Sequence, residues 1–236
     1  MRNLIRRLWL ALAAVALVCA SARAQMIAYG VTTSDSLYRI DLSTGVVTTV
    51  GSMGISNMIE GLAVAPNGQL YGTDTQGQLY AIDATTGTGT LLFSLGTGNI
   101  EGLDFLGDTL VAATFSATPS RLFSIDLSSG AMTDFVTVAT GLDASTNRAL
   151  AFLDTNTAFV SNDAGGSLAG LFRIDLTTGT STLVGNLSVS SGQLASMDIA
   201  ADGNLYGLDY SGHVFRINQT DGAITTVANA PSAYWL

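Results

Sequence analysis

The sequence predicts an all-β fold, a five-bladed β-propeller, and a hairpin motif that recurs five times is the first of three observations behind this prediction. Aligned on an Ile-Asp or Ile-Asn pair, the units read LYRIDLSTGVVTTV, LYAIDATTGTGTLL, LFSIDLSSGAMTDF, LFRIDLTTGTSTLV and VFRINQTDGAITTV. Their isoleucines, Ile40, Ile82, Ile125, Ile174 and Ile217, are separated by 42, 43, 49 and 43 residues. Such a period is typical of propeller blades and also of solenoid repeats.

The second observation is the alternation of apolar and polar residues within each unit, which is the pattern of half-buried strands. Each motif is predicted to be a hairpin with a turn of the form Asp-x-Ser/Thr-Thr/Ser-Gly. The Asx side chain accepts hydrogen bonds from backbone amides ahead of it, and the glycine adopts positive φ. We therefore interpret the Asx residues as turn formers rather than as ligands of five cations; they are Asp41, Asp83, Asp126, Asp175 and Asn218.

A further pair of strands precedes the later hairpins, which brings the expected number to four strands per blade. The segments EGLAVAPNGQLYGTD from Glu60 and ASMDIAADGNLYGLD from Ala195 each contain an apolar strand, a tight turn and a second strand. Asn-Gly at 67–68 and Asp-Gly at 202–203 are strong hairpin signals within these segments. The segments EGLDFLGDTLVAATF and RALAFLDTNTAFVSND repeat the arrangement in the two units between them.

The third observation is an offset at the two ends of the repeat array. The segment MIAYGVTT from Met26 enters directly at a second strand, whereas PSAYWL remains after the last unit, with 233–236 on the register of 61–64. We therefore expect the C-terminal strand to pair into the first blade and close the ring, which a propeller requires and a capped solenoid does not. The expected blades are about 26–56 with 230–236, 57–97, 98–140, 146–188 and 193–229.

The start of the chain predicts export. An Arg-bearing segment, an apolar run from Leu8 to Ala20 and small residues at Ala22 and Ala24 form a secretory signal peptide over 1–24, followed by a single propeller domain over 25–236. The apolar run is too short to span a bilayer and no second one follows, so we expect no membrane insertion. The expected location is secreted or periplasmic.

The charge of the chain limits its partners. There is no Lys, and four of the nine Arg lie in the predicted signal, whereas all 18 acidic residues lie beyond it, so the net charge after the signal is −13. This balance argues against nucleic acid as a partner. We expect a monomer whose partner is a protein or a small-molecule ligand.

Five residues are candidates for ligand binding, because they are expected on inner strands around the central tunnel. Glu60 and Glu101, the only glutamates, occupy the same place in adjacent units, and Arg148 takes that place in the next unit. Carboxylates that meet at a tunnel mouth raise a pKa or bind a cation, so both Glu are also metal candidates; alternatively they bond to backbone amides and Arg148 pairs with one of them. Asp104 and Asp198 interrupt apolar inner strands, where they line the tunnel as ligands or bond to a neighbouring loop.

The only histidine, His213, follows a Ser-Gly turn and is expected at the start of a strand. General acid or base chemistry needs a partner group, and the sequence reveals none for it. It also has no nearby cysteine with which to form a zinc site.

The unit GLAVAPNGQLYGTDTQGQLYAIDATTG resembles the blade repeat of secreted bacterial propellers in the broad group of gluconolactonase-like, NHL-type and quinoprotein-like families. The resemblance covers nearly all of the chain after the signal and implies the propeller fold. Gluconolactonase-like enzymes hold a metal in the tunnel, partly through the Glu of an EGP sequence, so EGL at Glu60 and Glu101 would imply a divalent cation. Quinoprotein repeats carry a Trp after the turn that all five units lack, so no PQQ cofactor is expected.

These features favour an exported, non-catalytic propeller scaffold that binds an unknown ligand or protein partner. The sequence contains no GxSxG nucleophile elbow, P-loop or HExxH motif. Two alternatives stay open: a metal-dependent hydrolase, lactonase or lyase with its site in the tunnel, and a structural component of the cell surface or matrix.

Overall fold

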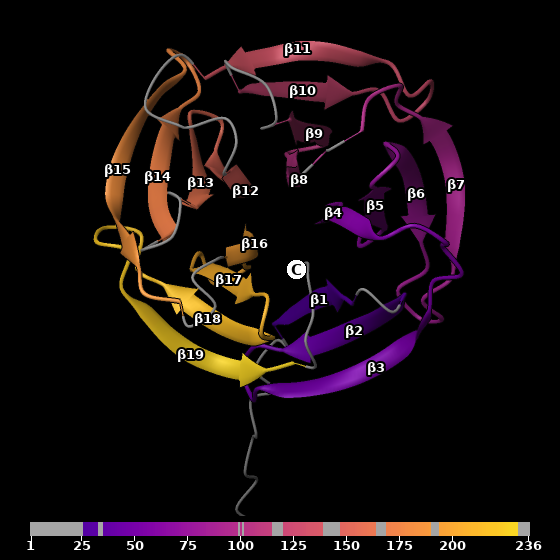
Figure 1. Ribbon diagram of the computed structural model, residues 1–236, viewed down its shortest axis with the longest axis horizontal. Helices are drawn as coiled ribbons and strands as arrows, with labels where there is room; N and C mark the ends of the chain where they lie inside the picture. The colour runs from indigo at the N-terminus through magenta and orange to yellow at the C-terminus, as the bar shows by residue number, and fades with distance from the viewer. Residues whose placement is uncertain are drawn as a thin grey trace, which may run out of the picture.

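The computed structural model describes residues 26–32, 35–98, 100, 102–114, 120–138, 147–163, 169–189 and 194–230, without the side chains of 147, 148, 163 and 169. This part of the chain forms 19 strands and no helix, and therefore contains no helix that could cross a membrane. The strands make five antiparallel sheets around a common centre, each with its strands stacked from the centre to the rim (Figure 1). The predicted five-bladed β-propeller is confirmed.

The blades follow one another around the ring in chain order (Figure 1). The first sheet contains β1 (Ile27–Val31), β2 (Ser36–Asp41) and β3 (Val46–Ser52). The second contains β4 (Ile59–Val64), β5 (Leu70–Asp74), β6 (Gln78–Ile82) and β7 (Gly89–Ser94). The third contains β8 (Gly102–Leu106), β9 (Thr109–Thr114), β10 (Arg121–Ile125) and β11 (Met132–Thr137). The fourth contains β12 (Asn147–Asp154), β13 (Thr157–Asp163), β14 (Ala169–Asp175) and β15 (Thr180–Leu187). The fifth contains β16 (Leu194–Ile199), β17 (Leu205–Asp209), β18 (His213–Ile217) and β19 (Ile224–Asn229).

The first blade differs from the others in its number of described strands. Its sheet contains three strands in the order β1-β2-β3, whereas each of the other four sheets contains four. After β19 the amide of Ala230 donates a hydrogen bond to the carbonyl oxygen of Gly212 at 2.7 Å. Residues 231–236, which we expect to supply the inner strand of the first blade, lie outside the described residues, so that strand stays a prediction.

The hairpin between the third and fourth strands of each blade is held by its Asx residue. In the fourth blade, Oδ1 of Asp175 accepts hydrogen bonds from the amides of Thr177 and Thr178 at 2.9 and 3.0 Å. Gly179 follows with a φ of 71°, which favours glycine because a side chain there is strained. Both bonds also form at Asp41 and Asp83, and the first of them forms at Asp126 and Asn218, so all five residues are confirmed as turn formers.

These bonds change the acidity of the turn carboxylates. Amides of Thr178 and then Thr177 lower the pKa of Asp175, because they donate to the charged form. The pKa of Asp83 is lowered by amide bonds of its own turn, and that of Asp126 by hydroxyl and amide bonds of its turn. The turn acids therefore stay ionised and structural.

Apolar side chains form five core clusters, one at each interface between neighbouring blades. The cluster between the fifth and first blades joins Ile40 and Leu42 to Tyr206, Val214 and Ala228. Ile40 and Val214 are fully buried, and burying such an aliphatic side chain contributes roughly 1.5–3 kcal/mol. Side-chain packing between the first and last blades therefore joins the two ends of the ring.

Close backbone contacts add to this packing near the rim. A Cβ at Gly51 of β3 would overlap the carbonyl oxygen of Thr86 in the hairpin turn of the second blade. In the same way, a Cβ at Gly185 of β15 would overlap the carbonyl oxygen of Asp221 in the turn of the fifth blade. These two positions require glycine because each blade's outer strand lies directly against the next blade's turn.

Candidate functional site

The inner strands bring one equivalent residue from each of four blades to the axis of the ring. Strands β4, β8, β12 and β16 are neighbours around the centre (Figure 1). Their pairing with the second strand of each blade shows that four residues are equivalent: Ala63, Asp104, Ala151 and Asp198. In the same order, they lie opposite Tyr71, Val111, Phe159 and Tyr206. We call the four inner-strand residues the axial layer. Two of the blades contribute an acid to it.

Asp104 is only 8% exposed and reaches across to the next inner strand. Its Oδ2 accepts a hydrogen bond from the amide of Phe152 on β12 at 2.7 Å, and its Oδ1 accepts one from the amide of Phe105 at 2.6 Å. Burial raises the pKa of Asp104 well above its ordinary value, and the negative charge of Asp198 raises it further, while the two amides lower it in part. Since Asp198 belongs to a blade two positions further round, this repulsion acts across the axis.

Among the described residues, fewer hydrogen-bond donors stabilise the charged form of Asp198 than that of Asp104. Its Oδ1 accepts a hydrogen bond from the amide of Ile199 at 2.6 Å, and burial raises its pKa to about 6. A carboxyl group with a raised pKa stays protonated to a higher pH, and a cation bound near two such groups stabilises their charged form. The axial pair therefore has the chemistry of a cation or proton site.

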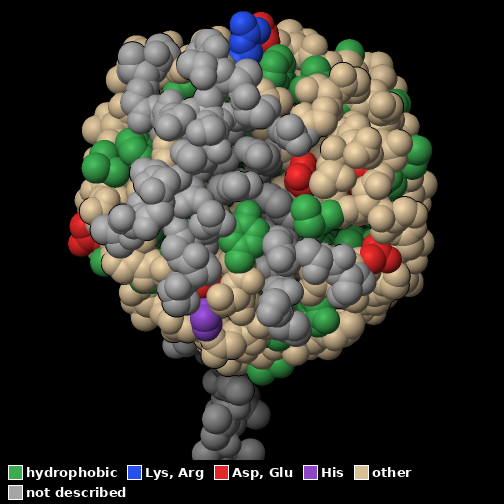
Figure 2. Space-filling view, in the orientation of Figure 1, with side chains coloured by type: hydrophobic (Ala, Val, Ile, Leu, Met, Phe, Trp, Pro, Cys, Tyr) green, Lys and Arg blue, Asp and Glu red, His purple; other side chains and the backbone are tan. Residues whose placement is uncertain are grey.

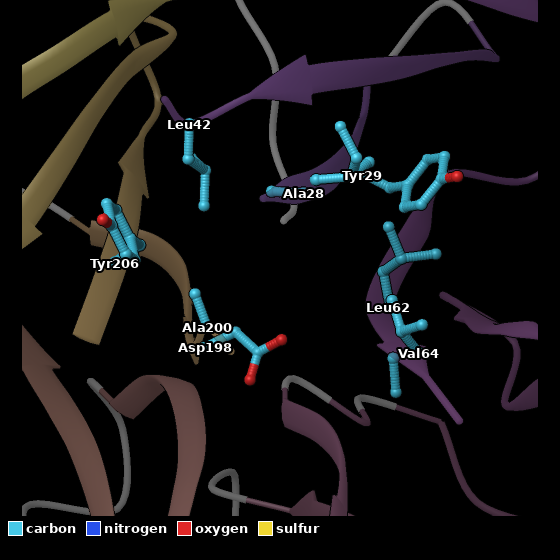
Figure 3. A pocket seen from close by; sticks show the side chains of 10 residues that line it. Ala28, Tyr29, Leu42, Leu62, Val64, Asp198, Ala200 and Tyr206 are labelled. Atoms are coloured by element: carbon cyan, nitrogen blue, oxygen red, sulfur yellow. The ribbon is translucent and has the colours of Figure 1, made fainter. Parts of the chain in front are cut away.

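Asp198 also lines an apolar pocket beside the axis. The cavity, of about 50 Å³, is bounded by β1, β4, the end of β16 and β17. In Figure 3 the carboxylate of Asp198 points into the opening toward Leu62 and Val64, with Ala28 and Tyr29 along another wall. The pocket lies between β4 and β16, the inner strands of the second and fifth blades. The first blade stands between these two blades in the ring, so the pocket occupies the place expected for its inner strand. Asp198 is its one acidic lining residue.

The positions of Glu60 and Arg148 coincide with β-bulges. Glu60 is the extra residue between Ile59 and Gly61 in the pairing of β4 with β5, and Arg148 is the extra residue in the pairing of β12 with β13. Bulges change the direction in which a side chain points. Glu60 is half-buried with its Oε2 atom shielded from solvent. The side chain of Arg148 and the whole of Glu101 lie outside the described residues.

No group of three or more His, Cys, Asp and Glu side chains that could hold a metal ion occurs in the part of the chain that the structure describes. Glu101 lies outside that part, so the metal site expected from Glu60 and Glu101 stays a prediction. The same holds for the metal-dependent hydrolase, lactonase or lyase that would use it. Within the described residues, the carboxylates of the axial layer are those of Asp104 and Asp198.

A second set of buried acids, which the sequence analysis missed, ends the second strand of two blades. Asp74 on β5 and Asp209 on β17 are both 0% exposed. Oδ1 of Asp74 accepts hydrogen bonds from the amides of Gln76 and Gln78, each at 2.9 Å. Its Oδ2 accepts from the Tyr80 hydroxyl at 3.1 Å. Burial, and then the charge and hydrogen bond of Asp74, raise the pKa of Tyr80 to about 12.

Asp209 repeats this arrangement in the fifth blade and binds the only histidine. Its Oδ1 accepts hydrogen bonds from the amides of Ser211 and His213, each at 2.9 Å, and its Oδ2 lies 2.9 Å from Nδ1 of His213. His213 begins β18, as expected. The partner that the sequence did not reveal for His213 is therefore Asp209.

A repeated offset could have identified these two acids. They end LYGTD and LYGLD, and each stands eight residues before the isoleucine of the hairpin motif. The equivalent residues of the other blades are also polar and buried; they are Thr32, Thr114 and Asn162. A polar residue at a constant place in every repeat, between a strand and its turn, is the mark of a structural hydrogen bond acceptor.

The face of the ring shown in Figure 2 is predominantly neutral and acidic. Among the described residues visible there, positive side chains appear at one place on the rim, whereas acidic side chains appear at several. The histidine, purple in Figure 2, is also on this face, and the side chain of His213 is 37% exposed. A partner that approaches this face therefore meets few positive charges among the described residues.

Comparison with protein families gives one match. A family model described as "Repeat of unknown function (DUF6923)" matches residues 113–234, just over half of the 236-residue chain. The chain belongs to this family. The DUF6923 match begins at the end of β9 and includes all the described strands of the fourth and fifth blades, so in this chain the repeat corresponds to propeller blades. No curated protein matches the chain.

Solved structures share the fold at low sequence identity. The propeller of a nidogen/laminin complex is 14% identical, with 90% of this chain and 80% of that chain covered and a TM-score of 0.57. TolB from Acinetobacter baumannii is 20% identical with a TM-score of 0.52; the match covers 87% of this chain but only 53% of TolB. A protein of unknown function from Bacteroides caccae is 13% identical over 86% of this chain and 73% of that chain, with a TM-score of 0.52. At these identities the likeness shows the fold alone.

Proposed function

We propose that this DUF6923 chain is an exported, non-catalytic propeller that serves as a binding scaffold, and that it takes a positively charged group of a ligand or protein partner at the axial layer. The observation that carries this proposal is the presence of two carboxyl groups from different blades in the axial layer, the buried Asp104 and the half-buried Asp198, with the charge of Asp198 acting on Asp104. A cation placed between them would replace the proton that they hold and remove the repulsion.

The remaining candidates fit a role around this site. Glu60 lies three residues before Ala63 on the same inner strand, and Arg148 lies three residues before Ala151 on another. We propose that Glu60, Glu101 and Arg148 surround the approach to the axial layer and select the partner by charge. The bulged positions of Glu60 and Arg148 support a role at the edge of the site rather than in the packed core.

Two further observations support an exported scaffold. The segment 1–24 has the composition of a secretory signal peptide, so we place the protein outside the cytoplasm, secreted or periplasmic. The structurally similar nidogen is seen in a complex with laminin, which supports partner binding for this chain at the level of fold only.

The test is a thermal unfolding titration with two probes, calcium chloride and 1,4-diaminobutane, at about pH 5 and about pH 8, on either side of the pKa of Asp198. A ligand present at about a hundred times its Kd stabilises the folded state by about 2.7 kcal/mol. We expect at least one probe to raise Tm, and to do so more at the higher pH, where the pair is ionised. The two probes distinguish a metal ion from an amine. No stabilisation by either probe would overturn the axial cation site.

A matched pair of variants locates the effect. Asp198→Asn should abolish the stabilisation, because it removes one of the two axial charges. Asp134→Asn should retain it, because Asp134 is exposed and pairs with Arg121 at 3.2 Å on the third blade. If Asp198→Asn responds to the probes as the unchanged protein does, the cation binds elsewhere.

A further inference from the structure

Polar grooves lie at equivalent places on three blades, over the second, third and fourth strands next to the hairpin turns. The groove of the fifth blade has a volume of about 670 Å³ and lies over β17, β18 and β19. The groove of the fourth blade, about 500 Å³, lies over β13, β14 and β15, and that of the second blade, about 360 Å³, over the turn before β5 and over β6 and β7. All three volumes fall in the usual range of ligand sites, about 300–1,000 Å³.

Two of these grooves contain an arginine at the same place. Arg216 on β18 lies opposite Thr225 on β19, and Arg173 on β14 lies opposite Thr182 on β15. Directly opposed residues in an antiparallel pair project from the same face of the sheet, so each arginine and threonine stand side by side. In the smaller groove of the second blade Ala81 takes this place. Arginine is scarce in this chain, with nine in total, four of which precede residue 25.

Donors and acceptors are mixed in the fourth-blade groove. Arg173 donates a hydrogen bond from Nη2 to Oγ1 of Thr157 at 3.3 Å, and the carboxylate of Asp175 lines the same groove. An anion bound there would meet Asp175, and a cation would meet Arg173. A hydroxyl group both donates and accepts, so a ligand rich in hydroxyl groups can satisfy both side chains at once.

The fifth-blade groove has the same character. Its lining combines the guanidinium of Arg216 with the amide side chains of Asn204, Asn218 and Gln219 and the hydroxyl of Thr225. Each amide offers both donors and an acceptor. The acidic balance of the whole chain disfavours an anionic polymer as the ligand.

We propose that the grooves of the fourth and fifth blades bind a neutral glycan chain, with Arg173 and Arg216 as equivalent anchoring residues. The two blades are neighbours, and the hairpin turn that borders the fifth-blade groove packs through Asp221 onto Gly185 of β15 in the fourth blade. A polymer of repeated sugar units that reaches both grooves contacts two copies of one site, and simultaneous contact with both strengthens its binding.

The test is affinity electrophoresis of the full chain in native gels that contain dextran, mannan, xylan or β-1,3-glucan. We expect at least one of these neutral polysaccharides to retard the protein. The double variant Arg173→Gln/Arg216→Gln should weaken this binding by about tenfold or more, the size expected when charge-assisted hydrogen bonds are lost. Retardation by none of the four, or unchanged retardation of the double variant, would overturn the proposal.

Three further variants sharpen the test. Arg121→Gln removes an exposed arginine of the third blade outside these grooves and should leave the retardation unchanged. Ala81→Arg introduces the missing arginine into the second-blade groove and should increase it. Asp198→Asn should have no effect, so a failure of the axial site and a failure of the grooves are separately visible. A further gel with sulfated dextran, an anionic polymer, controls for charge attraction. If this polymer alone retards the protein and high salt abolishes the retardation, the binding is electrostatic and a neutral ligand is contradicted.

Discussion

Asp104 and the two strand-end acids are buried and Asp198 is half-buried, and the surroundings of the two sets also differ. Asp209 accepts amide hydrogen bonds from Ser211 and His213 on one oxygen and contacts the His213 ring with the other. Asp198 accepts an amide bond from Ile199, whereas Asp104 accepts two, from Phe105 and Phe152, and also faces the charge of Asp198. The donors and the neighbouring charges around a carboxylate, rather than its burial alone, therefore separate an acid that holds the fold from one that is available to a ligand.

Three turn acids, whose side chains are exposed, form a third group in this comparison. Asp83, Asp126 and Asp175 have a lowered pKa because turn amides and hydroxyls donate to them, whereas burial raises the pKa of Asp198 to about 6. One residue type thus has opposite acid–base behaviour at two places of the same repeat. The predictions below test this difference, from the largest expected effect to the smallest.

The largest effect should follow removal of 231–236, the segment predicted to pair into the first blade and close the ring. If it supplies the inner strand of the first blade, its deletion removes Tyr234, Trp235 and Leu236 from the core, at roughly 1.5–3 kcal/mol for each large apolar side chain. We expect Tm to fall sharply and the pKa of Asp198 to move toward its ordinary value as water enters. The contact between Asp209 and His213 should persist. An unchanged Tm would contradict the predicted ring closure.

The next largest effect should come from a strand-end acid. Asp74→Ala leaves the amides of Gln76 and Gln78 without their acceptor inside the blade. Each buried polar group that loses its partner costs about 1–3 kcal/mol, so the free energy of unfolding in urea should fall by about 2–5 kcal/mol. A loss below about 1 kcal/mol would show that water replaces the carboxylate and that Asp74 is not structural.

An axial acid should behave in the opposite way. Because the folded-state pKa of Asp198 is raised to about 6, its contribution to stability is fully present below its unfolded value of 3.8 and is lost as the pH rises through about 6. Asp198→Asn should therefore stabilise the fold at about pH 8, by on the order of 1–3 kcal/mol, and change little at about pH 4. Urea unfolding at both values measures this. Destabilisation at the higher pH would place Asp198 among the structural acids.

The smallest effect should come from a turn acid. Asp175→Asn keeps an acceptor for the amides of Thr177 and Thr178, and Asn218 already fills the equivalent place in the fifth blade. We expect little change in Tm near neutral pH. The lowered pKa of Asp175 means that its charge stabilises the fold above its ordinary pKa of 3.8, and that this is lost as the pH falls through the lowered value. A thermal melt series in acid should therefore show less acid sensitivity for the variant, and an equal sensitivity would argue against the lowered pKa.

The repeat predicts the fold because the interactions that define it are local. The side chain of Asp175 bonds to amides only two and three residues further along the chain. A short sequence pattern is therefore enough to identify such a hairpin, and its five copies identify five hairpins. The acceptor role of Asp74 is almost as local, and the offset of eight residues to Ile82, repeated from Asp209 to Ile217, is a signal that the sequence contains.

The site is harder to predict because its contacts are distant in sequence. Asp104 receives its second hydrogen bond from Phe152, 48 residues later, and its charge repels that of Asp198 from a blade further on. Only the curvature of the ring brings these groups together. The sequence identified Asp104 and Asp198 as anomalies in apolar strands, but not as a pair, and it gave no sign that Arg173 and Arg216 line separate grooves.

The most direct test of the difference between the two sets of acids is a pH titration of the aspartate side-chain carboxyl carbons by NMR, with assignments from Asp198→Asn and Asp175→Asn. We predict that Asp198 titrates at about pH 6, and that Asp104 also titrates well above its ordinary value while Asp83, Asp126 and Asp175 titrate below theirs. Titration of Asp198 near its ordinary value of 3.8, together with the turn acids, would contradict the axial pair and the binding site proposed from it.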